Sequence, residues 1–192
     1  MASLRQLFLK HQAQTSDFPM GIEIEKAEGV YMFDNKGNKI IDVIAGIGVS
    51  NVGHRHPKVV EAIKNQVDNY MHIMVYGEFV QSPQVKLAKA LSDTLPENLN
   101  TTYFLNSGSE AVEGALKLAK RFTGRSEIIS CIDAYHGSSH GALSVGGNES
   151  LKQNYRPLLP DIKHFRFGKI EDLELISKKV IFCILLLLIF LN

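Results

Sequence analysis

Apolar residues recur at helical spacing over much of the chain. After Pro57 an apolar residue recurs at every fourth position through Val67, which predicts a helix that begins at the proline and has one apolar face. A second helix is predicted over residues 82–95 and a third over residues 109–122, closed by Gly124. Two shorter helices are expected over residues 3–12 and 170–178.

Alternating and short apolar runs predict the strands. Residues 21–42 are predicted as hairpin strands around a turn at 34–38, followed by a glycine-containing loop. Further strands are predicted at Thr102–Leu105 and Glu127–Ile132. Because these strands alternate with helices, the sequence predicts an α/β layer with a mainly parallel sheet.

The last part of the chain is apolar without interruption from Val180 to Leu191. A membrane-spanning helix needs about 20 such residues, so this run is too short to cross a bilayer. We expect Val180–Leu185 to form a buried strand of the sheet. A membrane anchor is the alternative that this length disfavours.

Composition narrows the class of protein. The chain has 192 residues, of which 45% are hydrophobic and 21% charged, as in a globular domain with one core. Its net charge of +1 argues against a nucleic-acid partner. Cys131 and Cys183 lie in apolar runs, which favours buried thiols in a reducing compartment. Residues 1–14 lack the apolar segment of a signal peptide, so a cytoplasmic protein is expected.

A polar turn, Asn106-Ser107-Gly108-Ser109-Glu110, lies where a helix is predicted to begin. A helix N-terminus has unpaired N–H groups and a partial positive charge, and glycine permits close approach of a ligand. With hydroxyl donors from Ser107 and Ser109, the turn suits a phosphate group. The same residues also fit a capping box, which needs no ligand. Taken alone, the five residues leave both interpretations open.

Other motifs exclude several kinds of site. Asn51 stands where a dinucleotide fingerprint needs its third glycine, and His54-Arg55 follows Gly53 where a P-loop needs Lys-Ser/Thr. The histidine pairs, His54 with His56 and His136 with His140, lack the further ligands of a metal site, so no metal is expected.

An aromatic residue, Tyr135, follows the predicted strand 127–132 in the triplet Tyr135-His136-Gly137. An aromatic side chain at the carboxyl end of a strand can lie flat against a planar ligand. A tyrosine packed on the surface of an ordinary turn is the alternative.

Together these motifs resemble the class III aminotransferases that depend on pyridoxal 5′-phosphate (PLP). The segments that carry the likeness keep the order and spacing of the family: Gly46-Ile47-Gly48-Val49, Gly53-His54-Arg55-His56-Pro57, Asn106-Ser107-Gly108-Ser109-Glu110-Ala111 and Tyr135-His136-Gly137. The likeness extends from about Gly21 to about Lys178.

The resemblance implies roles for five residues. Gly108 and Ser109 would hold the phosphate of PLP through backbone N–H groups, with Ser107 adjacent. Tyr135 would stack on the pyridine ring, with His136 beside it. We therefore expect Gly108 and Ser109 to begin a helix, and Tyr135 to follow a neighbouring strand on the same side of the sheet.

The resemblance also implies a fold, the fold type I transferase, with a mainly parallel sheet in a large PLP-binding domain and a smaller second domain. Residues 1–55 would form the N-terminal segment with small-domain strands. Residues 56–178 would form the first part of the large domain, and residues 179–192 an aberrant apolar tail. The family assembles as a homodimer.

The implied activity is transfer of an amino group between an amino acid or amine and a 2-oxo acid. Ser138 stands where the acetylornithine and ornithine branches usually have an arginine that binds a substrate carboxylate, which argues against those substrates. The Schiff-base lysine and the pyridinium-binding aspartate come later in the family's pattern. We therefore expect no catalytic residue in this chain and no activity of the chain alone. A non-catalytic PLP- or phosphate-binding remnant and a non-functional fragment are the alternatives.

Overall fold

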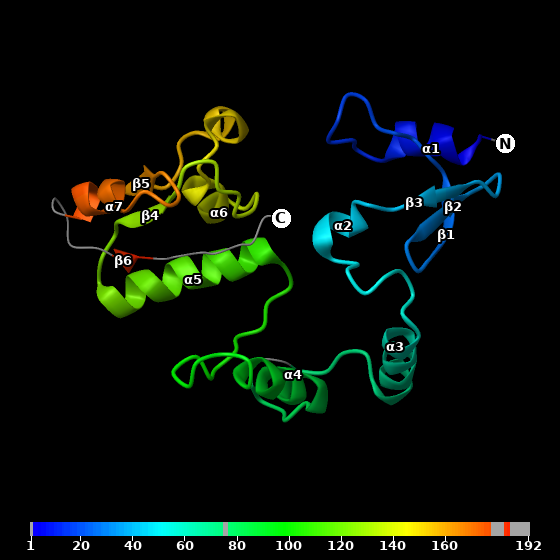
Figure 1. Ribbon diagram of the computed structural model, residues 1–192, viewed down its shortest axis with the longest axis horizontal. Helices are drawn as coiled ribbons and strands as arrows, with labels where there is room; N and C mark the ends of the chain where they lie inside the picture. Colours follow the sequence, from blue (N-terminus) through cyan, green and yellow to red (C-terminus); the bar gives the residue numbers. More distant parts are fainter. Residues whose placement is uncertain (1, 75–76, 178–182, 185–192) are drawn as a thin grey trace. The chain divides into compact units, whose positions relative to one another are not determined.

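The computed structural model describes residues 2–74, 77–177 and 183–184, and its chain forms two compact units that part between Phe79 and Val80 (Figure 1). The predicted division of the whole fold near residue 55 stays a prediction. Each unit has its own sheet, and the second unit contains the buried core.

The first unit contains an antiparallel sheet in the order β1-β2-β3, formed by Ile24–Glu28, Tyr31–Asp34 and Lys39–Ile41. The turn between β2 and β3 is closed by the Asp34 carboxylate, which accepts hydrogen bonds from the backbone N–H groups of Lys36 and Asn38 at 2.9 and 2.8 Å. The predicted hairpin and its turn are confirmed.

Three helices accompany this sheet: α1 (Leu4–His11), α2 (Ala45–Gly48) and α3 (Pro57–Asn69). Ser3 and Gln6 form a capping box that starts α1. The short α2 contains left-handed residues, with φ near 61° at Gly46 and 62° at Ile47, so it is a tight turn in the predicted glycine loop. Helix α3 begins at Pro57, as predicted.

The second unit contains a parallel sheet in the order β5-β4-β6, formed by Ile162–Phe165, Ile128–Cys131 and Cys183–Ile184. The predicted parallel sheet is confirmed, with β4 as its central strand. Strand β6 falls within the predicted strand 180–185. The other residues of that prediction, and those that follow it, lie outside the described residues.

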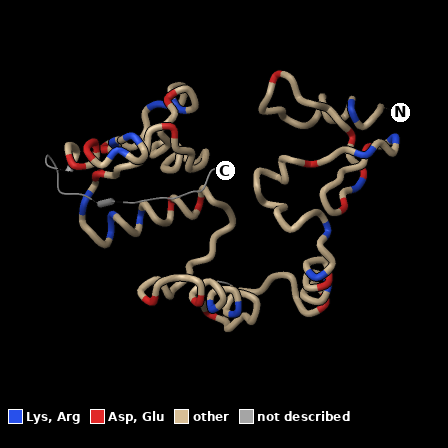
Figure 2. The backbone as a smooth tube through the Cα atoms, viewed as in Figure 1, with Lys and Arg blue, Asp and Glu red and all other residues tan. Residues whose placement is uncertain are grey.

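The core of the second unit forms where α5 (Gly108–Thr123) and α6 (His140–Val145) pack beside β4 (Figure 1). Its buried side chains are Val112, Leu116, Ile128, Ala142 and Val145. Acidic Glu110 lies in the first turn of α5 and basic residues in its last turn, which complements the helix dipole (Figure 2). Gly124, at φ 68°, ends the helix as predicted.

The remaining helices of the second unit are α4 (Ser82–Ser92), α7 (Ile170–Ser177) and two short 3₁₀ turns, Glu149–Leu151 and Gln153–Tyr155. The predicted strand Thr102–Leu105 is wrong, because this segment has no ladder with any described strand. Among the described residues, no helix has both the length and the apolar character needed to span a membrane.

Two leucines of α5 provide a test of the core. Leu116 is 4% exposed and Leu118 is 67% exposed. We expect Leu116→Ala to lower the free energy of unfolding by about 2–5 kcal/mol, since it leaves a cavity. Leu118→Ala should change it by about 0.5 kcal/mol or less. Denaturant unfolding followed by circular dichroism measures both, and equal losses would contradict the described core.

Candidate functional site

The first turn of α5, residues 107–110, is here called the N-terminal turn. Ser107 is the N-cap of the helix, and its Oγ accepts a hydrogen bond from the backbone N–H of Glu110 at 3.1 Å. The Glu110 carboxylate accepts from the N–H of Asn106 at 2.8 Å rather than from that of Ser107. One bond of the predicted capping box, from the Glu110 N–H to Ser107 Oγ, is therefore present. The reciprocal bond is replaced by the one from the Asn106 N–H to the Glu110 carboxylate.

The N-terminal turn contains two backbone N–H groups that can donate to a ligand. Among the described residues, no acceptor is found for the backbone N–H groups of Gly108 and Ser109. A Cβ atom added at Gly108 would meet no other atom within 4 Å, so there is open space beside it. Unpartnered N–H groups at a helix N-terminus are suited to an anion.

The loop that follows β4, residues 132–139, is here called the β4 loop, and it lies directly against the N-terminal turn. The backbone N–H of Ser139 donates to Ser109 Oγ at 3.1 Å. A Cβ atom added at Gly137 would lie 2.9 Å from Ser109 Cα and 2.7 Å from Ser109 Cβ. Only glycine permits this approach, and its φ of 128° also disfavours other residues. The start of α5 and the segment after β4 thus meet in one place.

The hydroxyl of Ser109 is occupied by this contact. Ser139 Oγ donates its one proton to Glu113 Oε1 at 2.6 Å. In the 2.6 Å contact between the two serine hydroxyls, Ser109 must therefore be the donor. The Ser109 hydroxyl thus already has an acceptor within the chain, while its backbone N–H group has none among the described residues.

The Glu113 carboxylate accepts several hydrogen bonds in this region. Its Oε1 also accepts from the backbone N–H groups of Gly141 at 2.7 Å and Ala142 at 3.1 Å. Burial acts to raise the pKa of Glu113, but the hydrogen bonds from Ser139, Ala142 and Gly141 outweigh it and hold the pKa below its ordinary value. The carboxylate is therefore ionised at neutral pH, as its role as an acceptor requires.

The β4 loop presents an aromatic ring beside a buried histidine. Tyr135 is 47% exposed, and its hydroxyl lies 3.1 Å from Ser138 Oγ. His136 is 5% exposed, and its Nδ1 has no hydrogen-bond partner among the described residues. Burial lowers the pKa of His136, and the nearby His164 lowers it further, so the imidazole is neutral at pH 7.

One of the histidines considered as metal ligands, His54, has a structural contact instead. His54 Nε2 lies 2.7 Å from the Asp42 carboxylate and joins the sheet of the first unit to the loop before α3. Within residues 2–74, 77–177 and 183–184, no group of three or more His, Cys, Asp and Glu residues could hold a metal ion.

Two residues of this region, Glu113 and Ser139, were not among the predicted site residues. Glu113 lies four positions after Ser109, on the same face of α5, and this spacing is a signal that the sequence contains. Ser139 immediately precedes α6, a helix of six residues that the sequence pattern did not indicate.

Comparisons with known proteins identify the family of this chain. A family model described as aminotransferase class-III matches residues 12–182. The chain is 38% identical over 173 residues to an acetylornithine aminotransferase of Methanopyrus kandleri, a match that covers 88% of this chain. The chain belongs to the class III aminotransferase family.

Solved structures show the same fold. An adenosylmethionine-8-amino-7-oxononanoate aminotransferase from Methanocaldococcus jannaschii is 32% identical, with a TM-score of 0.81 over 91% of this chain and 44% of that one. A taurine:2-oxoglutarate aminotransferase from Bifidobacterium kashiwanohense, solved in complex with PLP and glutamate, is 28% identical, with a TM-score of 0.76 over 90% of this chain and 43% of that one. The predicted fold type I architecture is confirmed.

The chain spans about two fifths of the length of the curated relatives it matches. The share is 43% for the Methanopyrus kandleri enzyme and 39% for an acetylornithine aminotransferase of Bacillus cereus.

The close approach at Gly137 can be tested against a glycine that lacks it. Gly168 also has a positive φ, 75°, but a Cβ atom there would meet nothing within 4 Å. Gly168→Ala should cost about 1 kcal/mol of unfolding free energy through backbone strain alone. Gly137→Ala should cost about 1–3 kcal/mol more, since it also forces Ser109 away. Denaturant unfolding that gives the same loss for both variants would contradict the contact.

The pKa of Glu113 predicts a pH dependence of stability. Because folding lowers this pKa, the contribution of the carboxylate is complete above the unfolded-state value near 4.5 and is lost as the pH falls through the folded value. The stability gap between the unmodified chain and Glu113→Gln should therefore be largest at pH 7 and shrink towards pH 3. Unfolding curves across this range measure it, and a gap that widens in acid would contradict the assignment.

Proposed function

We propose that this chain forms the part of a PLP-dependent aminotransferase site that binds the cofactor's phosphate and stacks on its ring. The observation that carries the proposal is the unpartnered N-terminal turn of α5 held against the β4 loop. In this proposal Ser107, Gly108 and Ser109 bind the phosphate, while Tyr135 and His136 lie at the ring.

The chemistry of the N-terminal turn supports the phosphate assignment. Two backbone N–H groups without an acceptor in the described part of the chain, and the partial positive charge of a 16-residue helix, favour a dianion. The Ser107 hydroxyl accepts from Glu110, and its own proton remains available to donate. The open space beside Gly108 leaves room for phosphate oxygens at the backbone.

The β4 loop supports the ring assignment. The half-exposed ring of Tyr135 is available to stack on a planar pyridine. The neutral, buried imidazole of His136 adds no positive charge that would oppose protonation of the ring nitrogen. Its unpartnered Nδ1 is free to hydrogen-bond a group beyond the described residues.

When bound, PLP supplies an electron sink for bonds broken at the substrate's Cα atom. The residues of this chain bind and orient it. Amino transfer also needs a lysine that moves a proton and a carboxylate that keeps the ring nitrogen protonated. In this proposal both belong to the part of the family fold that this chain does not span, so we expect the chain alone to bind without turnover.

The amino donor is not assigned, but Ser138 limits it. Its neutral hydroxyl, 3.1 Å from that of Tyr135, cannot form the bidentate pair that an arginine forms with a carboxylate. We propose that a substrate carboxylate is not bound at this position. An amino acid or amine donor and a 2-oxo acid acceptor follow from the family.

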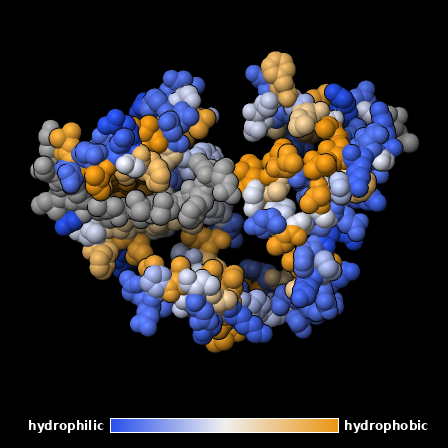
Figure 3. Space-filling model, in the orientation of Figure 1, coloured by the Kyte–Doolittle hydropathy of each residue, from blue (hydrophilic) through white to orange (hydrophobic). Residues whose placement is uncertain are grey.

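We also propose that the whole protein is a cytoplasmic homodimer. Apolar side chains gather on the surface of the first unit around α2 (Figure 3), where Val43 is 88%, Ile47 85% and Val49 79% exposed. Apolar clusters of this kind favour burial against further protein. The thiol of Cys131 is free, which accords with a reducing compartment.

A charge placed in the N-terminal turn tests the phosphate assignment. Gly108→Asp is compatible with the first turn of a helix but repels a phosphate, by about 4 kcal/mol for two unit charges 4 Å apart near a surface. PLP should bind the unmodified chain saturably and be displaced by inorganic phosphate. Gly108→Asp should weaken PLP binding more than about tenfold, whereas Asn100→Asp on an exposed loop should not.

The same experiment separates binding from catalysis. Borohydride reduction of the PLP mixture should label no single lysine stoichiometrically, and a transaminase assay should give no turnover. Binding that phosphate does not displace, or that survives Gly108→Asp, would overturn the proposed function.

A further inference from the structure

Two polar side chains outside the proposed cofactor contacts connect the N-terminal turn to the β4 loop. The hydrogen bonds run from Ser109 Oγ to Ser139 Oγ and from Ser139 Oγ to Glu113, each at 2.6 Å. Glu113 and Ser109 belong to α5, while Ser139 ends the β4 loop. These hydrogen bonds thus link α5 to the β4 loop, two segments that lie far apart in the sequence.

Ser139 is not simply a helix cap. It is the N-cap residue of α6, yet its side chain makes no capping bond to that helix. The carboxylate of Glu113 takes this role instead, since it accepts from Gly141 and Ala142. The Ser139 hydroxyl is left to join Ser109 to Glu113.

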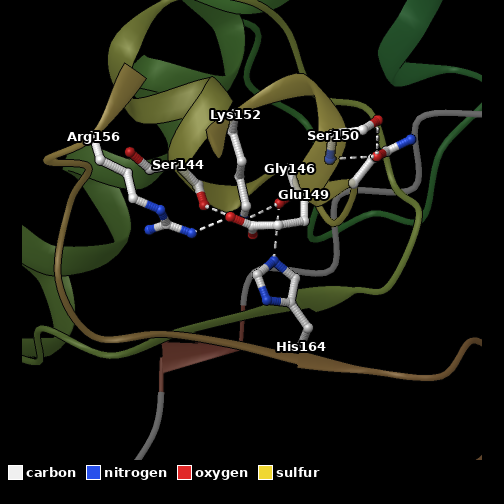
Figure 4. Close-up of polar contacts among 8 residues, drawn as sticks. Ser144, Gly146, Glu149, Ser150, Lys152, Arg156 and His164 are labelled. Carbon is white, nitrogen blue, oxygen red and sulfur yellow. Dashed lines mark hydrogen bonds and ion pairs between the residues drawn. The ribbon is translucent and has the colours of Figure 1, made fainter. Parts of the chain in front are cut away.

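The other end of α6 is also held by a charged group. Lys152 is 6% exposed, and its Nζ donates to the carbonyl oxygens of Ser144 at 3.4 Å and Gly146 at 2.7 Å (Figure 4). His164 Nε2 lies 3.0 Å from the same Gly146 oxygen. A carboxylate at the start and an ammonium at the end both complement the direction of the helix dipole.

The absence of a side chain at Gly141 allows a close contact with Glu113. A Cβ atom added at Gly141 would lie 2.9 Å from Glu113 Cδ, so a side chain there would push the Glu113 carboxylate away. Gly137 contacts Ser109 in the same way. The β4 loop thus contacts α5 at Gly137 and the start of α6 contacts it at Gly141, with Ser139 between the two glycines.

We propose that Glu113 and Ser139 are positioning residues that fix the β4 loop, with Tyr135, at a set distance from the N-terminal turn. This inference rests on the proposed function, because it concerns a ligand that contacts both segments. Glu113 and Ser139 themselves touch neither the phosphate nor the ring.

The proposal predicts different effects on the binding of two ligands. Inorganic phosphate needs only the N-terminal turn of α5, whose geometry is set by Ser107 and the helix itself. PLP needs the turn and the ring-binding loop at the right separation. Loosening the loop should therefore weaken PLP and spare phosphate, whereas a general loss of structure weakens both.

The test uses Ser139→Ala and Glu113→Gln in the full chain. Dissociation constants are measured for PLP by absorbance titration and for inorganic phosphate by competition, with circular dichroism of each variant. We expect PLP to bind about tenfold more weakly, the effect of losing one charge-assisted hydrogen bond, and phosphate to bind within about twofold of the unmodified chain. Ser139→Thr, which keeps the hydroxyl and suits an N-cap, should restore PLP binding.

Matched controls are Ser150→Ala and Glu171→Gln, which make the same changes outside this chain of hydrogen bonds and should alter neither constant. Unchanged PLP binding in Ser139→Ala, or parallel weakening of both ligands, would overturn the positioning role. If Glu113→Gln does not fold, the serine variants decide the question. PLP binding to the unmodified chain that phosphate cannot displace would instead overturn the proposed function, and the positioning role with it.

Discussion

The close approach of Gly137 to Ser109 is the contact on which the second unit's site depends. The loop after β4 can approach the start of α5 this closely because Gly137 has no Cβ. Once the loop is in place, α6 begins at the right point to pack Ala142 and Val145 on the core. The candidate site and the placement of α6 on the core therefore share this contact.

The elements that were predicted correctly are those with local signals. Helices α3, α4 and α5 begin near residues that set a helix start, and Gly124 ends α5 through its left-handed conformation. The candidate phosphate-binding turn could be proposed from the sequence because its donors belong to consecutive residues. The relation between Ser109, Ser139 and Glu113 could not, because it depends on the distance between segments that only the folded sheet brings together.

The elements that were wrongly predicted or missed also depend on contacts between distant segments. Thr102–Leu105 has the composition of a strand, but a strand also needs a neighbour, and none of the described strands pairs with it. Strand β5 and helix α6 are short, and their formation depends on β4 and α5 rather than on their own periodicity. The apolar face of α3 was predicted, but its residues Val59, Ile63 and Val67 are each about half exposed. The described contacts therefore do not bury this face.

The strand order β5-β4-β6 has a consequence for synthesis on the ribosome. Strand β4 is made first, gains β5 on one edge, and gains β6 on its other edge only when residues 183–184 emerge. Until then the central strand of the sheet has one open edge, and at about 5–20 residues per second this interval lasts seconds. In that interval the open edge of β4 can pair with a strand of a neighbouring chain, a route to aggregation that the addition of β6 closes.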